Sequence, residues 1–131
     1  MESNPDPSVP KCKLKQAIIV CTTQRDGKKM RKGKMVAQAC HASVKAAMRS
    51  TVAVYKAWNE EGHKKVVLKV PNEDDLIDLF NLAETFIGLP CAIIVDHGLT
   101  QISAGSVTAL AIGPAEDEVV DMITKSLRLL Q

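Results

Sequence analysis

Aromatic residues are scarce in this chain of 131 residues, since only Tyr55, Trp58, Phe80 and Phe86 occur. The core must therefore be built from aliphatic side chains, which make up most of the 46% hydrophobic content. So few rings also argue against an aromatic platform of the kind on which single-strand binders stack bases.

Long apolar runs and familiar site motifs are also missing. No segment approaches the ~20 apolar residues of a membrane-spanning helix, so we expect a soluble, cytoplasmic protein. The sequence contains no GxGxxG, GK[ST] or GxSxG motif. Its four cysteines, Cys12, Cys21, Cys40 and Cys91, show no metal-ligand spacing. Because Cys21, Cys40 and Cys91 lie in apolar periodic segments, we expect buried thiols in a reducing compartment.

Three prolines and no apolar run characterise residues 1–10, "MESNPDPSVP". Such a composition predicts a disordered tail and not a signal peptide. We therefore expect residues 1–12 to form a tail and residues 13–131 to form a single domain, which is long enough to bury a core.

The apolar pattern along the rest of the chain predicts the order βαβαββα. Strands are expected at 15–23, 64–70, 91–95 and 107–112, and helices at about 33–48, at 51–61, from Asn72 as N-cap to Gly88, and from Gly113-Pro114 onward. The strands are almost continuously apolar, which indicates burial on both faces. These features predict an α/β fold, a three-layer α/β/α sandwich with a four-stranded mixed, mostly parallel sheet.

Positive charge is concentrated in one segment, although the net charge is only +2. Residues 25–34, "RDGKKMRKGK", contain six Lys or Arg and one Asp. A basic cluster on an otherwise mildly acidic domain is typical of a docking site for a polyanion. A solvated, mobile loop explains the cluster equally well.

The helix after this segment carries two stripes at helical spacing. The stripe expected to be buried contains Val36, Ala37, Cys40, Val44, Ala47 and Met48. The polar stripe contains Lys34, Gln38, His41 and Lys45, within about 60° of one another. A solvated face explains the polar stripe, and a lone helical His is more often structural than catalytic. Lys34, however, lies in the first turn, where a cation is unfavourable and invites an anionic partner.

A second polar segment, "DHGLTQISAGS", runs from Asp96 to Ser106 after the third strand. It is long for a plain connection, and its two glycines would let backbone approach a substrate closely. If the first and third strands are parallel, Asp96 and Lys34 lie at the same edge of the sheet, where ligands usually bind. The residues themselves thus indicate a site beside a basic patch, and they do not identify a reaction.

Three segments together resemble the archaeal and eukaryotic peptidyl-tRNA hydrolase 2 family: "KGKMVAQACHA" (32–42), "KVVLKV" (65–70) and "DHGLTQISAGSVTALAIGP" (96–114). The resemblance extends from about Lys15 to the C-terminus. It implies hydrolysis of the ester that joins a peptide to the 3′ ribose of tRNA, which recycles tRNA from prematurely released peptidyl-tRNA. It implies no organic cofactor, and the sequence offers no metal-ligand cluster.

Matching the family motifs residue by residue implies a set of site residues. The implied catalytic residues are Lys34, His41, Asp96, Thr100 and Thr108, and the implied substrate contacts are Gln38, Gln101 and Ser106. The basic segment adds Lys28, Lys29, Arg31 and Lys32 as contacts to tRNA phosphates. Two residues depart from the family pattern, Arg31 before "KGK" and His97 before Gly98, where small residues are usual.

These residue types suit ester hydrolysis. Asp96 can orient or deprotonate water, and Lys34 can stabilise a developing oxyanion. The division of roles among Lys34, His41 and Asp96 stays open at this stage.

Two other interpretations deserve comparison with the enzyme. A non-catalytic RNA-binding relative would keep the basic segment, but it would not need Asp96, Thr100 and Gln101. An adaptor in protein turnover would use a helical face, for which the sequence holds no direct support. We therefore expect peptidyl-tRNA as the partner and no membrane, and a homodimer is a candidate assembly.

Overall fold

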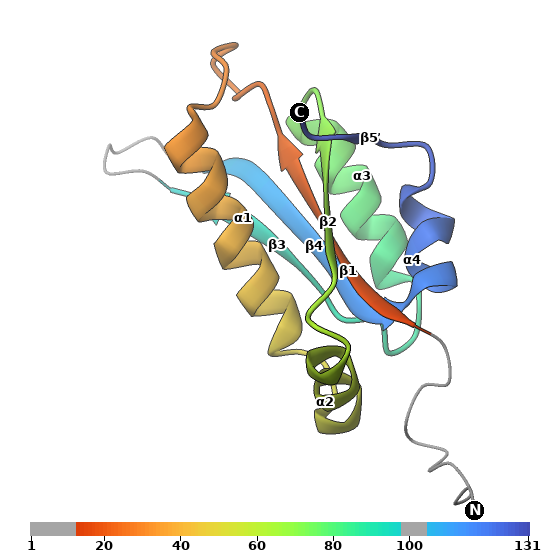
Figure 1. The fold of residues 1–131 in the computed structure, drawn as a ribbon. Helices are drawn as coiled ribbons and strands as arrows, with labels where there is room; N and C mark the ends of the chain where they lie inside the picture. The colour runs from red at the N-terminus through yellow and green to blue at the C-terminus, as the bar shows by residue number, and fades with distance from the viewer. Residues whose placement is uncertain (1–12, 98–104) are drawn as a thin grey trace, which may run out of the picture.

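The computed structural model describes residues 13–97 and 105–131. Its elements in chain order are β1 (Leu14–Cys21), α1 (Lys32–Ala47), α2 (Val52–Glu60), β2 (Lys65–Val70), α3 (Glu73–Glu84), β3 (Cys91–Asp96), β4 (Ser106–Glu116), α4 (Asp117–Thr124) and β5 (Arg128–Leu129) (Figure 1). Within these residues, no helix combines the length and the hydrophobicity needed to cross a membrane.

The described strands form one mixed sheet of five strands in the order β3-β4-β1-β2-β5. Only β1 and β2 pair in parallel, whereas β4 is antiparallel to both β1 and β3, and β5 is antiparallel to β2. The α/β class and the mixed sheet are thus confirmed, but four strands and a mostly parallel sheet are wrong. Strand β4 returns directly from β3 and inserts beside β1, and two residues of β5 are too few to leave an apolar pattern.

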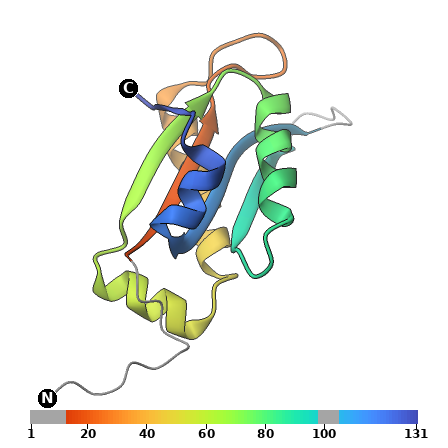
Figure 2. The ribbon, with the colours of Figure 1, turned by 90° about the vertical axis from the view of Figure 1, so that its right-hand side faces the viewer.

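Helices on both faces of the sheet explain why its strands are almost continuously apolar (Figures 1 and 2). On one face, Ala17 and Ile19 of β1 belong to a buried cluster with α3 and α4. On the other face, Ile18 and Val20 belong to a cluster with Ala42 of α1. Successive residues of a strand point to opposite faces, so β1 must be apolar at nearly every position. This two-sided burial, which suggested parallel strands, applies to the antiparallel β4 as well.

The buried face of α1 differs from the expected stripe. Its buried residues are Gln38, Ala42, Ser43 and Ala46. Val36 is 63% exposed and Val44 is 60% exposed, so the expected buried stripe is wrong. The sheet beneath α1 presents small side chains such as Ala109 and Ala111, and small helix residues let the two backbones approach closely. The larger aliphatic residues of α1 therefore point away from this contact.

A buried polar contact holds α1 in this rotation. The side chain of Gln16 in β1 is fully buried. Its amide nitrogen donates to the Ser43 carbonyl oxygen at 3.0 Å, and the Ser43 hydroxyl donates to the Gln16 amide oxygen. A buried amide without partners would be costly, so this pair favours one orientation of the helix on the sheet.

Two predicted helix boundaries are also corrected. Asn72 is confirmed as the N-cap of α3, because its side chain accepts from the Asp75 backbone N–H at 3.0 Å, but α3 ends at Glu84, before Gly88. Gly113-Pro114 does not start the last helix, since both residues lie in β4. Gly113 has a φ of 103°, and a Cβ there would lie 2.5 Å from the Lys15 carbonyl oxygen, so close strand packing requires glycine.

Of the cysteines, Cys12 lies outside the described residues. Cys21 and Cys91 are buried and free, as expected, and burial raises the pKa of both thiols. Cys40 is free but exposed, so the expectation of burial is wrong for this residue. Cys40 belongs to the stripe of α1 that was expected to be buried, and this stripe faces away from the sheet.

Candidate active site

The carboxyl ends of β1 and β3 lie at the same end of the sheet, because both strands run antiparallel to β4 (Figure 1). Asp96 is the last residue of β3, and α1 begins at this end with Lys34 in its first turn. The parallel direction on which the sequence-based expectation depended is therefore present, although β4 separates the two strands. This arrangement brings Lys34 and Asp96 together.

Lys34 and Asp96 form an ion pair, with 2.9 Å between Nζ and Oδ2. The Lys34 ammonium also donates to the side-chain oxygen of Gln24 at 2.7 Å. The side chains are 36% and 29% exposed, so the pair is partly sheltered and still open to a substrate. A cation in the first turn of a helix was expected to have an anionic partner, and Asp96 is that partner for Lys34.

This ion pair contributes little to the stability of the fold. Pairs with this much exposure are worth about 1 kcal/mol or less, because water screens them. The first turn of α1 contains no acidic residue that would complement the helix dipole. The ammonium of Lys34 at the start of α1 is therefore not explained by a gain in stability.

The other residues of the polar stripe do not all join this pair. Gln38, one turn beyond Lys34, is 8% exposed and belongs to the buried face of α1. His41 is exposed and lies seven residues from Lys34 in the same helix, which corresponds to about 10 Å of helical rise. His41 therefore lies beside the site and not within the ion pair.

Strand β4 supplies one residue beside Asp96 and a second that contacts the β3 backbone. Ser106 is the direct partner of Asp96 in the β3–β4 ladder, so their side chains lie on the same face of the sheet. Thr108 is fully buried, and its hydroxyl donates to the Ile94 carbonyl oxygen at 3.4 Å. Thr100 and Gln101 lie outside the described residues.

Gly105 has a structural reason to be a glycine. A Cβ at this position would lie 2.6 Å from Cγ1 of Val95 and 2.9 Å from Nδ1 of His97. Real Cβ atoms do not tolerate such approaches to neighbouring atoms. Because Gly105 has no side chain, it leaves space for the side chains of Val95 and His97. His97 is one of the two residues that depart from the family pattern.

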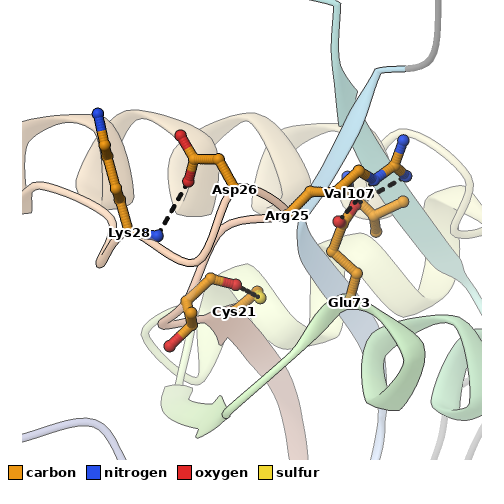
Figure 3. A network of polar contacts seen from close by, with 7 residues as sticks. Cys21, Arg25, Asp26, Lys28, Glu73 and Val107 are labelled. Carbon is orange, nitrogen blue, oxygen red and sulfur yellow. Dashed lines mark hydrogen bonds and ion pairs between the residues drawn. The ribbon is translucent and has the colours of Figure 1, made fainter.

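The basic loop, residues 22–31 between β1 and α1, is closed by backbone hydrogen bonds. Thr23 and Lys29 form an antiparallel bridge, and the Gln24 N–H donates to the Lys28 carbonyl oxygen at 2.8 Å. The Asp26 carboxylate accepts from the backbone N–H of Lys28 at 2.9 Å (Figure 3). These bonds give the loop a defined turn.

The basic residues of this region fall into two groups. Arg25 pairs with Glu73 and Lys34 pairs with Asp96. The remaining four, Lys28, Lys29, Arg31 and Lys32, are exposed. These four are the residues assigned to phosphate contacts from the sequence, and their exposure leaves them accessible to a polyanion.

Sequence reasoning missed two residues at this edge. Gln24 was not singled out, although its amide oxygen holds the Lys34 ammonium. Glu73 was not singled out either, although it is buried and pairs with Arg25. An acidic residue in a first helical turn has an ordinary explanation in the helix dipole, so the sequence carried no signal that distinguished Glu73.

A cavity with a volume of about 1540 Å³ lies elsewhere among the described residues. It is an apolar groove along the outward face of α1 and over β2, lined among others by Val36, Cys40 and Val67. Neither Lys34 nor Asp96 lines it. The described residues also contain no group of three or more His, Cys, Asp or Glu that could hold a metal ion. Lys34 and Asp96 therefore lie outside this groove, partly exposed, at the end of the sheet where β1 and β3 end.

Comparison with known proteins adds a family to this geometry. Residues 14–130 match the family model described as peptidyl-tRNA hydrolase PTH2. The peptidyl-tRNA hydrolase of Methanococcus maripaludis strain C7 is 46% identical over 118 residues, which cover 88% of this chain and 97% of that protein. That of Methanocaldococcus jannaschii is 46% identical over 120 residues, covering 89% and 100%. The probable peptidyl-tRNA hydrolase 2 of Dictyostelium discoideum is 40% identical over 118 residues, covering 88% and 54%.

Proposed function

This chain belongs to the peptidyl-tRNA hydrolase PTH2 family, and we propose that the Lys34–Asp96 ion pair is its hydrolytic centre. The protein is an enzyme that hydrolyses the ester between peptide and tRNA in peptidyl-tRNA, and it thereby recycles the tRNA. The single observation that supports the proposed centre is the 2.9 Å contact between ammonium and carboxylate at the open edge of the sheet.

The proposed chemistry divides the reaction between the two charges. Asp96 orients a water molecule and accepts its proton as the water oxygen adds to the ester carbonyl carbon. The Lys34 ammonium stabilises the negative charge that develops on the carbonyl oxygen. The tetrahedral intermediate then collapses, the bond to the ribose 3′ oxygen breaks, and this oxygen takes up the proton that Asp96 had accepted. The peptide carboxylic acid loses its own proton to solvent. The products are a peptide carboxylate and a tRNA with a free 3′ hydroxyl.

Neighbouring residues support these two in our proposal. Gln24 keeps the Lys34 ammonium at the edge through its 2.7 Å contact. Ser106, opposite Asp96 in the ladder, is close enough to contact bound substrate or water. We assign the exposed His41 to a contact with the substrate, and Gln38 to a substrate contact at the margin of the buried face of α1. Thr108 supports the backbone of the neighbouring strand β3. Thr100 and Gln101 complete the proposed set as substrate contacts.

The proposed tRNA contacts come from the basic loop and the start of α1. Lys28, Lys29, Arg31 and Lys32 are exposed and precede Lys34 in sequence. Phosphate contacts from these side chains would position any tRNA alike, because they carry no sequence information. Such contacts suit an enzyme whose substrates share the tRNA and differ in the peptide.

Incubating the purified protein with a defined peptidyl-tRNA tests this proposal against its alternatives. We expect multiple turnovers that release free peptide and deacylated tRNA. Binding without turnover would instead support a non-catalytic RNA-binding protein, and neither binding nor turnover would leave the adaptor interpretation.

Hydrolysis is expected to survive extensive dialysis against EDTA. The reason is that Asp96 already has a cationic partner in Lys34, and the sequence shows no metal-ligand spacing. Turnover should be measured before and after dialysis, with enough monovalent salt to keep the tRNA folded. A loss of activity that Zn²⁺ restores would contradict the metal-free centre. Mg²⁺ could also restore turnover by refolding the tRNA, which itself binds Mg²⁺. Folding the tRNA before the assay controls for this effect.

A further inference from the structure

Glu73 is a buried carboxylate that the proposed mechanism does not use. It is the first residue of α3, and only 8% of it is exposed. A negative charge at a helix N-terminus is favourable, which would be a sufficient explanation for an exposed residue. Burial makes that explanation incomplete, because a buried charge needs partners that satisfy it.

The partners of Glu73 come from two other parts of the chain (Figure 3). Oε2 accepts from Nε of Arg25 at 3.0 Å, and Oε1 accepts from Nη2 of Arg25 at 3.2 Å, which is the two-pronged geometry of strong arginine–carboxylate pairs. Oε1 also accepts a short hydrogen bond from the backbone N–H of Val107. One carboxylate thus connects α3 with the basic loop and with the start of β4.

Each of these partners directly follows a residue that contacts or pairs with one half of the proposed ion pair. Arg25 directly follows Gln24, whose amide oxygen holds the Lys34 ammonium at 2.7 Å. Val107 directly follows Ser106, the ladder partner of Asp96. The β3–β4 register shifts between Ile94 and Val95, so regular pairing is interrupted just where Asp96 is presented. Glu73 bonds to the opposite strand at this interruption.

We propose that Glu73 is a positioning residue that aligns Lys34 and Asp96 by holding the basic loop and the start of β4 on one carboxylate. The inference rests on the proposed function, since it takes the Lys34–Asp96 pair as the reacting centre. The Arg25 contact places Gln24 and the basic loop. The Val107 contact places the strand beside Asp96. Arg25 accordingly serves as an anchor for the loop and not as a phosphate contact.

The two contacts can be separated by substitution. Glu73→Gln keeps an oxygen that can accept from Val107 but removes the charge that pairs with Arg25. We expect kcat of Glu73→Gln to stay within about threefold of the wild type, while KM for peptidyl-tRNA rises because the loop is loosened. Glu73→Ala removes both contacts. Because a misplacement of about 1 Å can cost on the order of 100-fold, we expect its kcat to fall by about 10- to 100-fold.

Arg25→Ala provides an independent route to the same loop anchor, and it does not alter Glu73 itself. We expect it to raise KM as Glu73→Gln does, and we expect the double variant to show little further increase, because both changes remove one interaction. Additive increases in KM would overturn the shared anchor. This arm remains informative if Glu73→Ala does not fold.

Asp74→Asn is the matched control, since Asp74 is the next residue in the first turn of α3 and is exposed. If Glu73 acted only through the helix dipole, Asp74→Asn and Glu73→Gln would lower the melting temperature alike and leave kcat and KM unchanged. Equal effects of this kind would overturn the proposal, as would a folded Glu73→Ala with wild-type kcat and KM. Lys34→Ala, measured in the same assay, distinguishes failure of the proposed function from failure of the Glu73 proposal. If Lys34→Ala retains activity, the Lys34–Asp96 pair is not the hydrolytic centre, whatever the Glu73 variants show.

Discussion

Alanine at Lys34 or at Asp96 is expected to lower kcat at least ~100-fold, the usual scale for removing a positioned acid–base or oxyanion-stabilising group. The effect should appear in kcat, because both groups act most strongly on charge that develops in the transition state. Folding should change little, since an ion pair this exposed is worth about 1 kcal/mol or less. Single-turnover hydrolysis of peptidyl-tRNA and thermal unfolding measure the two properties separately.

Two further variants sharpen this test. Lys45→Ala removes a charge from an exposed position further along α1 and should leave kcat near the wild-type value. The double variant Lys34→Ala/Asp96→Ala should lose little more activity than either single variant, because residues that act as a unit are not additive. Near-normal turnover of a folded Lys34→Ala or Asp96→Ala protein would remove that residue from the mechanism.

Neutralising the basic loop is expected to raise KM with little change in kcat. The variant replaces Lys28, Lys29 and Arg31 with Gln, and all three are exposed. Phosphate contacts act equally on the bound substrate and the transition state, so their loss weakens binding without slowing the chemical step. With a slope of about 0.7 to 0.9 per contact, losing three contacts should raise KM by about 100- to 500-fold at about 0.1 M salt. The log–log salt dependence of KM should flatten by about two to three units.

A matched triple variant controls for net charge. Lys13 directly precedes β1, Lys56 lies in α2, and Lys65 is the first residue of β2. All three are exposed and lie toward the end of the sheet opposite the basic loop (Figure 1). Replacing these three with Gln removes the same charge and should leave KM and its salt dependence close to the wild type. Equal effects of the two triple variants would show that only net charge matters. An unchanged KM in the loop variant would direct attention to Lys45 and Arg49 on α1.

Much of the site could be read from the sequence because local signals were strong there. The apolar runs predicted β1, β2, β3 and β4, and Asn72 was recognisable as an N-cap from its place before an amphipathic pattern. The position of Lys34 at the start of a helix indicated an anionic partner, because the helix dipole disfavours a cation there. Asp96 was a candidate for that partner as soon as the direction of its strand was assumed.

Other features were not predictable because they depend on what lies opposite in space. Apolar periodicity shows that a helix has two faces, but the alanines of the sheet under α1 decided which face was buried, so Cys40 and Val44 became exposed while Gln38 became buried. Burial on both faces suggested parallel strands, yet it follows equally from helices on either side of an antiparallel strand such as β4.

By itself, the sequence determined the α/β class, the positions of the main elements, the basic loop and the two polar segments that contain Lys34 and Asp96. These depend on local composition and periodicity, which each segment carries in its own residues. Only the tertiary structure decided the strand order, the 2.9 Å contact between Lys34 and Asp96, and the contacts of Glu73. Glu73 is 48 residues from Arg25 and 34 from Val107, and no local pattern links side chains over such distances. Their contact exists because the packed sheet and helices bring the three chain segments to one edge.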